Sequence, residues 1–216
     1  MAFIKETATF AGPLGIWELS ESSSQMIPLL HFSEIEKAAF EKISNEKRKK
    51  EFLGVRLLLK TLLHQKTEIS YKDNGQPYLK NSRWNISISH SAELAVVLLS
   101  EKKTGIDVEN TQRNISSLVP RFLNDAEKRQ AEKEENPQQA RILYWSAKEA
   151  IYKCAGAANI DFKRQIRIYP FAMASGAHFR GALLADQTTR NFILGHLFFQ
   201  NNVIVYCVEK NKNEDS

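Results

Sequence analysis

The sequence predicts an α+β protein made of two similar lobes, with helices packed on a mainly antiparallel sheet in each lobe. Helical periodicity is followed by several short strand-like runs, and this order occurs twice along the chain, which indicates a pseudo-twofold duplication. The 216 residues, of which 43% are hydrophobic and 25% charged, are enough for two small units with their own cores. We predict an N-terminal lobe over residues 1–103 and a C-terminal lobe over residues 104–216.

The N-terminal lobe begins with alternating residues and then changes to a helical period. Alternation over Ala8–Leu19 predicts two short strands that turn at Gly12-Pro13. Ser33, with Glu36 three residues later, is a capping-box pattern and predicts the start of a helix. A second helix is expected over Ser44–Leu63, where the apolar period ends.

The C-terminal lobe should contain two helical segments, and short apolar or alternating runs predict strands in both lobes. One helical segment covers Val119–Lys133, and the other starts at Asn136 as N-cap, has Pro137 in its first turn and ends near Gly156. The expected strands are Ile69–Tyr71, Pro77–Leu79, Trp84–Ser89, Leu94–Leu99, Gly105–Val108, Ile166–Tyr169, His178–Leu184, Phe192–Phe199 and Val203–Glu209, the last two joined across Asn201-Asn202.

Several features predict a cytoplasmic protein that does not contact a membrane. Lys5 and Glu6 interrupt the apolar residues near the N-terminus, where a signal peptide would have an uninterrupted apolar run. No stretch is apolar over the length that a membrane-spanning helix needs. Cys154 and Cys207 are too few for a disulfide scaffold and do not have metal-ligand spacing, so we expect two free thiols.

The formal net charge of +5 favours an anionic partner, which could be nucleic acid, an anionic cofactor or an acidic protein. Much of the excess lies in the run Lys47–Lys50, followed by Arg56 and Lys60. A solvated helix face would have the same composition, so the charge by itself does not decide between these partners.

The first cluster of candidate site residues is Gly105–Glu109. Alternate residues of a strand face the same way, so Asp107 and Glu109 should project together. Two carboxylates on one face repel each other unless a cation lies between them, and Mg²⁺ takes carboxylate oxygens together with substrate phosphates. The alternative is an edge strand that carries two surface acids.

The second cluster lies on the helix that ends near Gly156. Trp145, Glu149 and Lys153 are spaced by four residues and therefore share one face. A Glu–Lys pair at this spacing is common on helix surfaces, but here it continues an apolar face that includes Ile142. Charged groups on such a face are costly unless they meet other charges. Together, the two clusters supply three carboxylates and a lysine, which suit a metal–pyrophosphate.

The two clusters resemble the signature pair of the phosphopantetheinyl transferase superfamily. The matching segments are Gly105-Ile-Asp-Val-Glu and, about forty residues later, Trp145-Ser-Ala-Lys-Glu-Ala-x-x-Lys. A third segment, Asn85-Ile-Ser-Ile-Ser-His-Ser, is similar to the stretch that precedes these motifs in the long, two-lobed members, which are named for a surfactin-synthetase activator.

The resemblance implies an enzyme that moves the 4′-phosphopantetheine moiety of coenzyme A onto a serine of an acyl or peptidyl carrier protein and releases 3′,5′-ADP. It implies that Asp107, Glu109 and Glu149 bind Mg²⁺. It also implies that Lys153 contacts the phosphates and assists the departure of the nucleotide. Either Glu149 or a metal-bound water would take the serine proton. The partner would be an acidic carrier protein, and nucleic acid would not be a partner. A two-lobed chain could form the whole site as a monomer.

The resemblance also implies a set of contacts to the nucleotide end of coenzyme A. Ser89 and His90 would hold phosphates, and the Gly75–Pro77 turn would lie near the adenine, with Gln76 where the family commonly has lysine. The residues implied to bind coenzyme A are Arg48, Lys49, Arg56, Gly75, Pro77, Ser89, His90 and Lys153.

Two other functions fit parts of the sequence. A Mg²⁺-dependent nuclease would also use acidic residues followed by a Glu and a Lys, although such sites commonly space Glu and Lys two positions apart on a strand. A basic nucleic-acid-binding module could use Lys47–Lys50, but it would leave the carboxylate clusters without a role.

Overall fold

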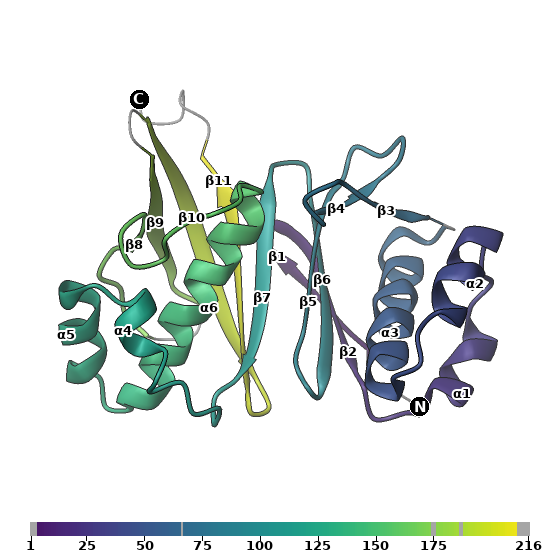
Figure 1. Cartoon of the computed structure of the whole chain (residues 1–216), viewed down its shortest axis with the longest axis horizontal. Helices are drawn as coiled ribbons and strands as arrows, with labels where there is room; N and C mark the ends of the chain where they lie inside the picture. The colour runs from purple at the N-terminus through teal and green to yellow at the C-terminus, as the bar shows by residue number, and fades with distance from the viewer. Residues whose placement is uncertain (1–3, 66, 174–175, 186–187, 211–216) are drawn as a thin grey trace. The chain divides into compact units, whose positions relative to one another are not determined.

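The computed structural model describes residues 4–65, 67–173, 176–185 and 188–210, and the chain divides into two units, Met1–Glu101 and Lys102–Ser216 (Figure 1). The described part has an α+β fold with three antiparallel sheets, which confirms the predicted fold class. Each unit has a hydrophobic core of its own. The duplication of one lobe into the other stays a prediction. In the described part of the chain, we find no helix with the length and apolarity needed to cross a membrane.

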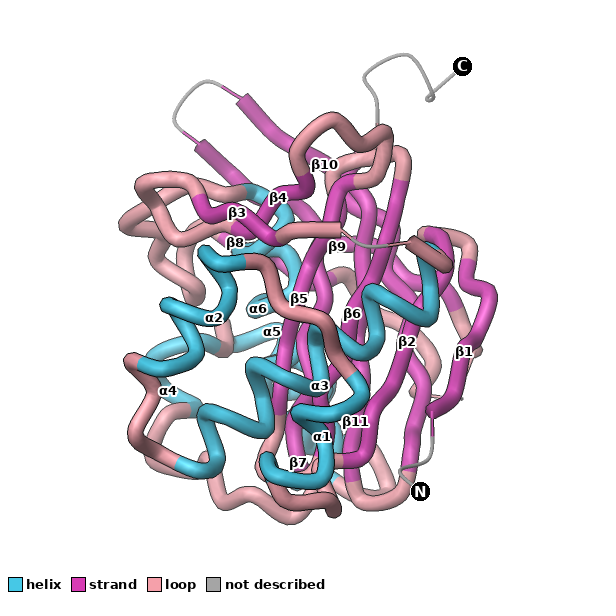
Figure 2. The backbone as a smooth tube through the Cα atoms, turned by 90° about the vertical axis from the view of Figure 1, so that its right-hand side faces the viewer, coloured by secondary structure: helices cyan, strands magenta, loops and turns pink. Residues whose placement is uncertain are grey.

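The first unit contains one larger sheet, a small hairpin and a layer of helices. The larger sheet has the order β1 (Ile4–Thr9), β2 (Gly12–Glu18), β6 (Leu94–Ser100) and β5 (Asn85–His90), and the hairpin pairs β3 (Ile69–Tyr71) with β4 (Pro77–Leu79). The helices are α1 (Ser23–Met26), the 3₁₀ helix η1 (Ile27–Leu29), α2 (Glu34–Glu41) and α3 (Glu46–Leu63). Figure 2 shows α1, α2 and α3 on one face of the larger sheet.

Helix α3 carries three of the seven candidate residues of the first unit, more than any other element there. Its N-cap lies one residue later than predicted, because the side chain of Asn45, and not that of Ser44, accepts the backbone N–H of Arg48 at 3.1 Å, and the helix begins at Glu46. It ends at His64, which has a left-handed φ of 50°. Its apolar face packs on β2 and β6, and a Cβ on Gly54 would already touch the side chain of Leu19. The opposite faces are therefore left for polar groups.

The second unit is a five-stranded sheet covered by helices. The strand order is β7 (Thr104–Asn110), β11 (Asn202–Glu209), β10 (Thr188–Phe199), β9 (His178–Ala185) and β8 (Ile166–Ile168), and every neighbouring pair is antiparallel. The helices are α4 (Val119–Phe122), α5 (Asp125–Lys133) and α6 (Pro137–Ala155). Helix α6 packs on β7 and β11.

A glycine allows α6 to lie close to β7. A Cβ on Gly105 would overlap the backbone carbonyl oxygen of Ala150, so a larger residue would push the helix away from the strand. Because Asp107 and Glu109 follow Gly105 on the same face of β7, the close approach brings both carboxylates within reach of α6.

Strong end signals predicted helix boundaries well, and one helix prediction is wrong. Helix α6 starts after Asn136, whose side chain accepts the Gln139 N–H at 3.1 Å, and it ends at Gly156 with φ of 62°, as predicted. The expected helix over Val119–Lys133 is broken into α4 and α5. The cause is Asn124, whose side chain caps α5 by accepting the N–H groups of Ala126 and Glu127.

Two predicted turns are also displaced. The first hairpin turns at Phe10-Ala11, because Thr9 Oγ1 accepts the backbone N–H groups of Ala11 and Gly12 at 3.2 Å each, and Gly12 already belongs to β2. The last hairpin turns at Gln200 and Asn201, so Asn202 is the first residue of β11.

Candidate active site

Helix α6 and strand β7 bring the two predicted clusters together. Lys153 Nζ lies 2.8 Å from Asp107 Oδ1, and Trp145 Nε1 donates to Glu109 Oε1 at 2.9 Å. Glu149 lies one helical turn from both Trp145 and Lys153 on the same helix face. The strand period and the helix period therefore do place these five side chains at one α6–β7 contact, as their spacing predicted.

Cations of the protein neutralise both strand carboxylates. Lys153 pairs with the buried Asp107, and Arg113 Nη1 donates to both oxygens of Glu109 at 2.6 and 2.8 Å. Gln138 holds the loop of Arg113 by donating to its backbone carbonyl at 2.8 Å. Sequence reasoning missed Arg113, and its only signal is a basic residue four positions after Glu109 in a turn.

Glu149 is the candidate residue with the most perturbed ionisation. The pKa of Glu149 is raised from 4.5 to about 7, chiefly by burial and also by the charges of Asp107 and Glu109, while Lys153 and Arg113 oppose the shift. A carboxyl group with a pKa near 7 can accept or release a proton at neutral pH, which is the property needed of a general base.

A cavity of about 1020 Å³ lies against Glu149. Its polar rim is cationic, since Arg121, Lys163 and Arg164 line it together with the acids Glu149 and Asp161. The remaining lining is mostly apolar and aromatic, and it consists of Leu118, Pro120, Phe122, Trp145, Tyr152, Asn159, Ile160 and Phe162. A cleft of this kind can admit an acidic partner with apolar contacts.

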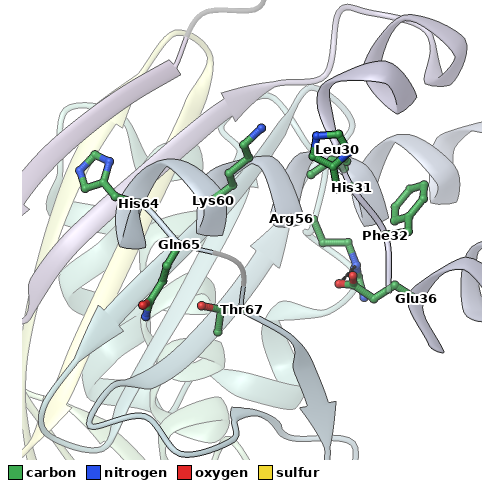
Figure 3. Close-up of a pocket in the computed structure, with 9 residues that line it drawn as sticks. All are labelled: Leu30, His31, Phe32, Glu36, Arg56, Lys60, His64, Gln65 and Thr67. Atoms are coloured by element: carbon green, nitrogen blue, oxygen red, sulfur yellow. Dashed lines mark hydrogen bonds and ion pairs between the residues drawn. The ribbon is translucent and has the colours of Figure 1, made fainter. Parts of the chain in front are cut away.

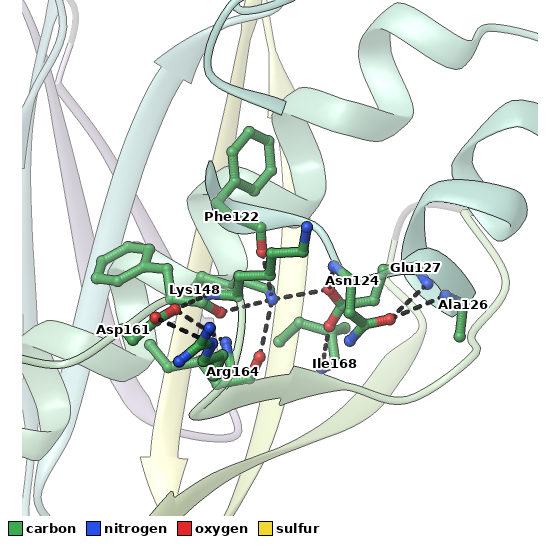
Figure 4. Close-up of polar contacts among 11 residues, drawn as sticks. Phe122, Asn124, Ala126, Glu127, Lys148, Asp161, Arg164 and Ile168 are labelled. Atoms are coloured by element: carbon green, nitrogen blue, oxygen red, sulfur yellow. Dashed lines mark hydrogen bonds and ion pairs between the residues drawn. The ribbon is translucent and has the colours of Figure 1, made fainter. Parts of the chain in front are cut away.

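Lys148 holds the walls of this cavity together from inside the core (Figure 4). The side chain is fully buried, and Nζ lies 2.7 Å from Glu127 Oε2. Nζ also donates to three backbone carbonyls, those of Phe122 at 2.7 Å, Phe162 at 2.9 Å and Ile166 at 2.7 Å. Lys148 thus links α6 to the end of α4, to the loop before β8 and to β8 itself.

Sequence reasoning gave Lys148 no role, although a signal was present. Tyr144 and Ile151, one turn before and after it, are buried, so the helical period places Lys148 on the apolar stripe. Burial lowers the pKa of Lys148, and the Glu127 carboxylate opposes that shift. Glu127 in turn accepts the backbone N–H groups of Asn124 at 3.0 Å and Ile168 at 2.9 Å, which satisfies both of its oxygens.

The predicted magnesium ligands are close together but do not form a metal-ready cluster. No group of three or more His, Cys, Asp or Glu side chains in the described part of the chain is arranged to hold a metal ion. The reason is that Asp107 turns to Lys153, and Glu109 turns to Arg113 and Trp145. The residue types nevertheless fit a hard cation, because all three ligands are carboxylates and the charges of Asp107 and Glu109 raise the pKa of Glu149.

In the first unit, two of the predicted nucleotide contacts meet at a buried acid. Arg48 Nη1 donates to Glu51 Oε2 at 3.1 Å, and His90 Nδ1 lies 3.4 Å from Glu51 Oε1. Ser89 is buried next to His90 at the end of β5. Sequence reasoning missed Glu51, whose signal is its position three residues after Arg48 on the same helix. Lys49 points elsewhere, with Nζ 5.9 Å from the ring centre of Phe40.

Arg56 is not brought together with Arg48 and His90. It lies eight residues beyond Arg48, about 12 Å along α3. Its Nε donates to Glu36 Oε1 at 3.0 Å, and both side chains are more than nine-tenths buried (Figure 3). Its implied contact with the nucleotide stays a prediction.

The turn between β3 and β4 contains Gly75 and Pro77. Gly75 has a φ of 79°, and its backbone N–H donates to the carbonyl of Lys72 at 2.8 Å. Lys72 Nζ donates to Gln76 Oε1 at 3.0 Å. A lysine ammonium is therefore present at this turn, although residue 76 is glutamine.

One family model matches the chain. Residues 103–207 match the model of the 4′-phosphopantetheinyl transferase superfamily, termed ACPS. The match begins just before β7 and includes Asp107, Glu109, Glu149 and Lys153, but none of the candidates on α3 or β5. No curated protein matches the chain.

Proposed function

Residues 103–207 are a domain of the 4′-phosphopantetheinyl transferase superfamily, and from this premise we propose that the chain transfers the 4′-phosphopantetheine moiety of coenzyme A to a serine of an apo acyl or peptidyl carrier protein. The observation that carries the proposal is the meeting of Asp107 and Glu109 on β7 with Glu149 and Lys153 on α6. These four residues lie within the matched domain and supply the charges that phosphoryl transfer requires.

In the proposed reaction, the carrier serine oxygen forms a bond to the β-phosphorus of coenzyme A. The bond between that phosphorus and the oxygen bridging to the α-phosphate breaks, and its electron pair leaves with 3′,5′-ADP. The serine proton has to go to a base, which would be either Glu149, whose pKa is about 7 without a metal ion, or a metal-bound water. Glu149 also borders the large cavity, where the serine would enter.

Lys153 is suited to stabilise the charge that develops on the departing nucleotide. Its ammonium is partly exposed and lies at Asp107, one turn from Glu149. We propose that it moves from Asp107 Oδ1 to the phosphate oxygens when coenzyme A binds. A compact point charge at that position acts mainly as negative charge builds, and therefore stabilises the transition state more than the bound substrate.

Asp107, Glu109 and Glu149 would hold Mg²⁺ in the proposed enzyme. When bound, Mg²⁺ supplies positive charge to the pyrophosphate oxygens and orients them. The carboxylates are the hard oxygen ligands this ion prefers, and two of their present partners, Lys153 and Arg113, are partly exposed side chains that would turn away. With Lys153 on the phosphates, Asp107 would be released for this role.

The nucleotide end of coenzyme A would contact the first unit. We propose that Arg48, Lys49, Ser89 and His90 bind its phosphates, and that the backbone at Gly75 and Pro77 lies near the adenine. Arg48 and His90 support this proposal because Glu51 holds both in one place. The acceptor would be an acidic carrier protein, which suits both the net charge of +5 and the cationic rim of the large cavity.

The deciding experiment is incubation of the chain with coenzyme A, Mg²⁺ and a panel of apo-carrier proteins, followed by intact-mass analysis. At least one carrier should gain the mass of one phosphopantetheine, and the gain should vanish when its acceptor serine is changed to alanine. The Asp107→Ala variant, which should remain folded, serves as the matched inactive enzyme. Unmodified carriers together with Mg²⁺-dependent cleavage of DNA would instead favour the nuclease.

A further inference from the structure

A separate cavity lies entirely within the first unit, beside Arg56 (Figure 3). Its volume is about 420 Å³, which falls in the range of roughly 300–1,000 Å³ that is usual for small-molecule sites. Residues from the segment before α2, from α2 itself, from the C-terminal half of α3 and from the segment after α3 line it. They are Leu30, His31, Phe32, Glu36, Arg56, Lys60, His64, Gln65 and Thr67.

The most unusual wall of this cavity is the buried Arg56–Glu36 ion pair. The two side chains are only 7% and 9% exposed. The Arg56 guanidinium also stacks on the ring of Phe52, with 3.2 Å between its central carbon and the ring centre. Burial lowers the pKa of Arg56, but an arginine keeps its charge in a folded protein. Withdrawing such a charge from water is costly, so every donor of the guanidinium needs an acceptor.

The protein does not supply all of these acceptors. Nε donates to Glu36 Oε1 at 3.0 Å, and Nη1 donates to the Phe52 carbonyl at 3.1 Å. Within the described ranges, no acceptor is found for the third nitrogen, Nη2, and this atom is not sealed from the solvent-accessible space. Glu36 is not available to turn, because Oε2 accepts the backbone N–H of Ser33 at 3.1 Å in the α2 capping box. A charged guanidinium N–H donor is therefore held in a fixed position at the cavity wall.

A second group in the lining has an unmet hydrogen-bond requirement. Thr67 Oγ1 is buried and has no hydrogen-bond partner among the residues that the structure describes. An unsatisfied buried hydroxyl is unfavourable, and a ligand in the cavity would satisfy it only if the Thr67 side chain turned toward the cavity. A purely structural Arg–Glu pair would not explain the accessible Nη2.

We propose that this cavity binds a small organic anion, a carboxylate with a compact apolar body. The lining contains two formal positive charges, on Arg56 and Lys60, against one negative charge on Glu36, which leaves a charge of +1 when both histidines are neutral. Leu30 and Phe32 provide the apolar contacts. The carboxylate would accept from Arg56 Nη2, and the apolar body would lie on the two hydrophobic side chains.

This site is different from the proposed coenzyme A site. Glu51, which holds Arg48 and His90, lies five residues before Arg56, so the two side chains leave α3 about 140° apart. Anion binding at this cavity therefore does not depend on the transfer reaction. Arg56 would then have a function other than the nucleotide contact implied by the resemblance.

The test uses the full chain without Mg²⁺ or carrier protein, and benzoate as the probe. Isothermal titration calorimetry should show benzoate binding about tenfold more tightly than benzyl alcohol, which keeps the ring but lacks the charge. Lys60→Gln should weaken benzoate binding about threefold, whereas Lys47→Gln, a matched exposed lysine on the same helix, should leave it unchanged. Equal affinities for the two probes, or no binding of either at millimolar concentration, would overturn the proposal.

A double substitution tests the ion pair directly. Removal of one partner would leave a buried charge unpaired, so Arg56→Met is combined with Glu36→Gln, and the melting curve of the variant checks that it folds. Benzoate binding should fall at least about tenfold in this variant. Saturating coenzyme A should leave benzoate binding to the unmodified chain unchanged. Competition by coenzyme A would overturn the inference and return Arg56 to the nucleotide site, while the intact-mass assay of transfer stays an independent result.

Discussion

Glu149 shows how the ionisation of one residue can report on the candidate active site. Its folded pKa of about 7 lies above the ordinary 4.5, so the folded protein keeps this proton between pH 4.5 and 7 where the unfolded chain has released it. The stability contributed by the bound proton is fully present below pH 4.5 and is lost as pH rises through 7.

The Glu149→Gln variant should therefore match the unmodified chain in stability at pH 4 and exceed it at pH 8. We expect a gain on the order of 1–2 kcal/mol at pH 8, measured by urea unfolding in EDTA, because glutamine carries no charge to bury. Mg²⁺ should raise the unfolding midpoint of the unmodified chain at pH 8 and should have little effect on the variant. A stability difference that is the same at both pH values would contradict the raised pKa.

Lys153 carries the second prediction at the residue scale. Since its ammonium is proposed to act as charge builds on the leaving phosphate, Lys153→Ala should lower kcat by roughly two to four orders of magnitude and weaken coenzyme A binding less. Lys153→Arg should restore little, because a planar fork replaces a compact charge. Single-turnover kinetics and coenzyme A titration separate the two effects. Near-normal turnover of Lys153→Ala would reduce the Lys153–Asp107 contact to a structural ion pair.

At the residue scale, the sequence identified those candidates that local periodicity can place. Asp107 and Glu109 follow the two-residue period of a strand, and Glu149 and Lys153 follow the helical period, so a single contact between β7 and α6 unites them. Arg113 and Glu51 were missed because their contacts depend on how a loop and a second element fold against them. No local pattern reports such contacts.

At the scale of elements, capping chemistry decided which boundaries could be predicted. Helix α2 has the capping box of Ser33 and Glu36, and α6 lies between Asn136 and Gly156, as expected. The same chemistry explains the failure at Val119–Lys133. Asn124 lies within the predicted helical run, but its side chain satisfies the first N–H groups of α5 and so begins a new helix. The very short α1 and η1 were not predicted, since four or fewer residues show no period.

The Lys148–Glu127 pair joins several of these elements, and its energetic role can be measured. Lys148→Met would leave the Glu127 carboxylate buried without its cation and should cost about 3–5 kcal/mol of unfolding free energy. Adding Glu127→Gln should recover part of that loss, because the amide carries no charge. Urea unfolding of both variants measures the recovery.

The matched control for this prediction is Lys128→Met on α5, whose side chain is 55% exposed. It should change stability by less than about 0.5 kcal/mol. If Lys148→Met were no more destabilising than this control, the buried network would not hold the cavity walls together. If the double variant were less stable than the single one, the charge of Glu127 would not be the source of the cost.

At the scale of the whole chain, the functional assignments of the two units are supported by different observations. The family match covers residues 103–207, in the second unit, and so supports the transferase assignment where the carboxylates and Lys153 lie. The first unit has no such match, and its proposed nucleotide contacts rest on the resemblance and on the meeting of Arg48 with His90 at Glu51. Its fold was predictable because its strands and helices have clear periods. The role of Arg56 could not be predicted from the sequence, because only the fold reveals that Arg56 pairs with Glu36.

The net charge of +5 leads to a prediction about the carrier protein. If an acidic carrier docks at the cationic rim formed by Arg121, Lys163 and Arg164, salt should screen the attraction between the two proteins, because the Debye length falls from about 10 Å at 0.1 M to about 3 Å at 1 M. The carrier KM should therefore rise with salt while kcat at saturating carrier changes little.

A variant with glutamine at Arg121, Lys163 and Arg164 should start with a higher carrier KM and show a weaker dependence on salt. Its KM for coenzyme A should stay near that of the unmodified chain, since these residues are not proposed to contact the nucleotide. A carrier KM that does not respond to salt, or an equal salt dependence in the triple variant, would place the docking surface elsewhere.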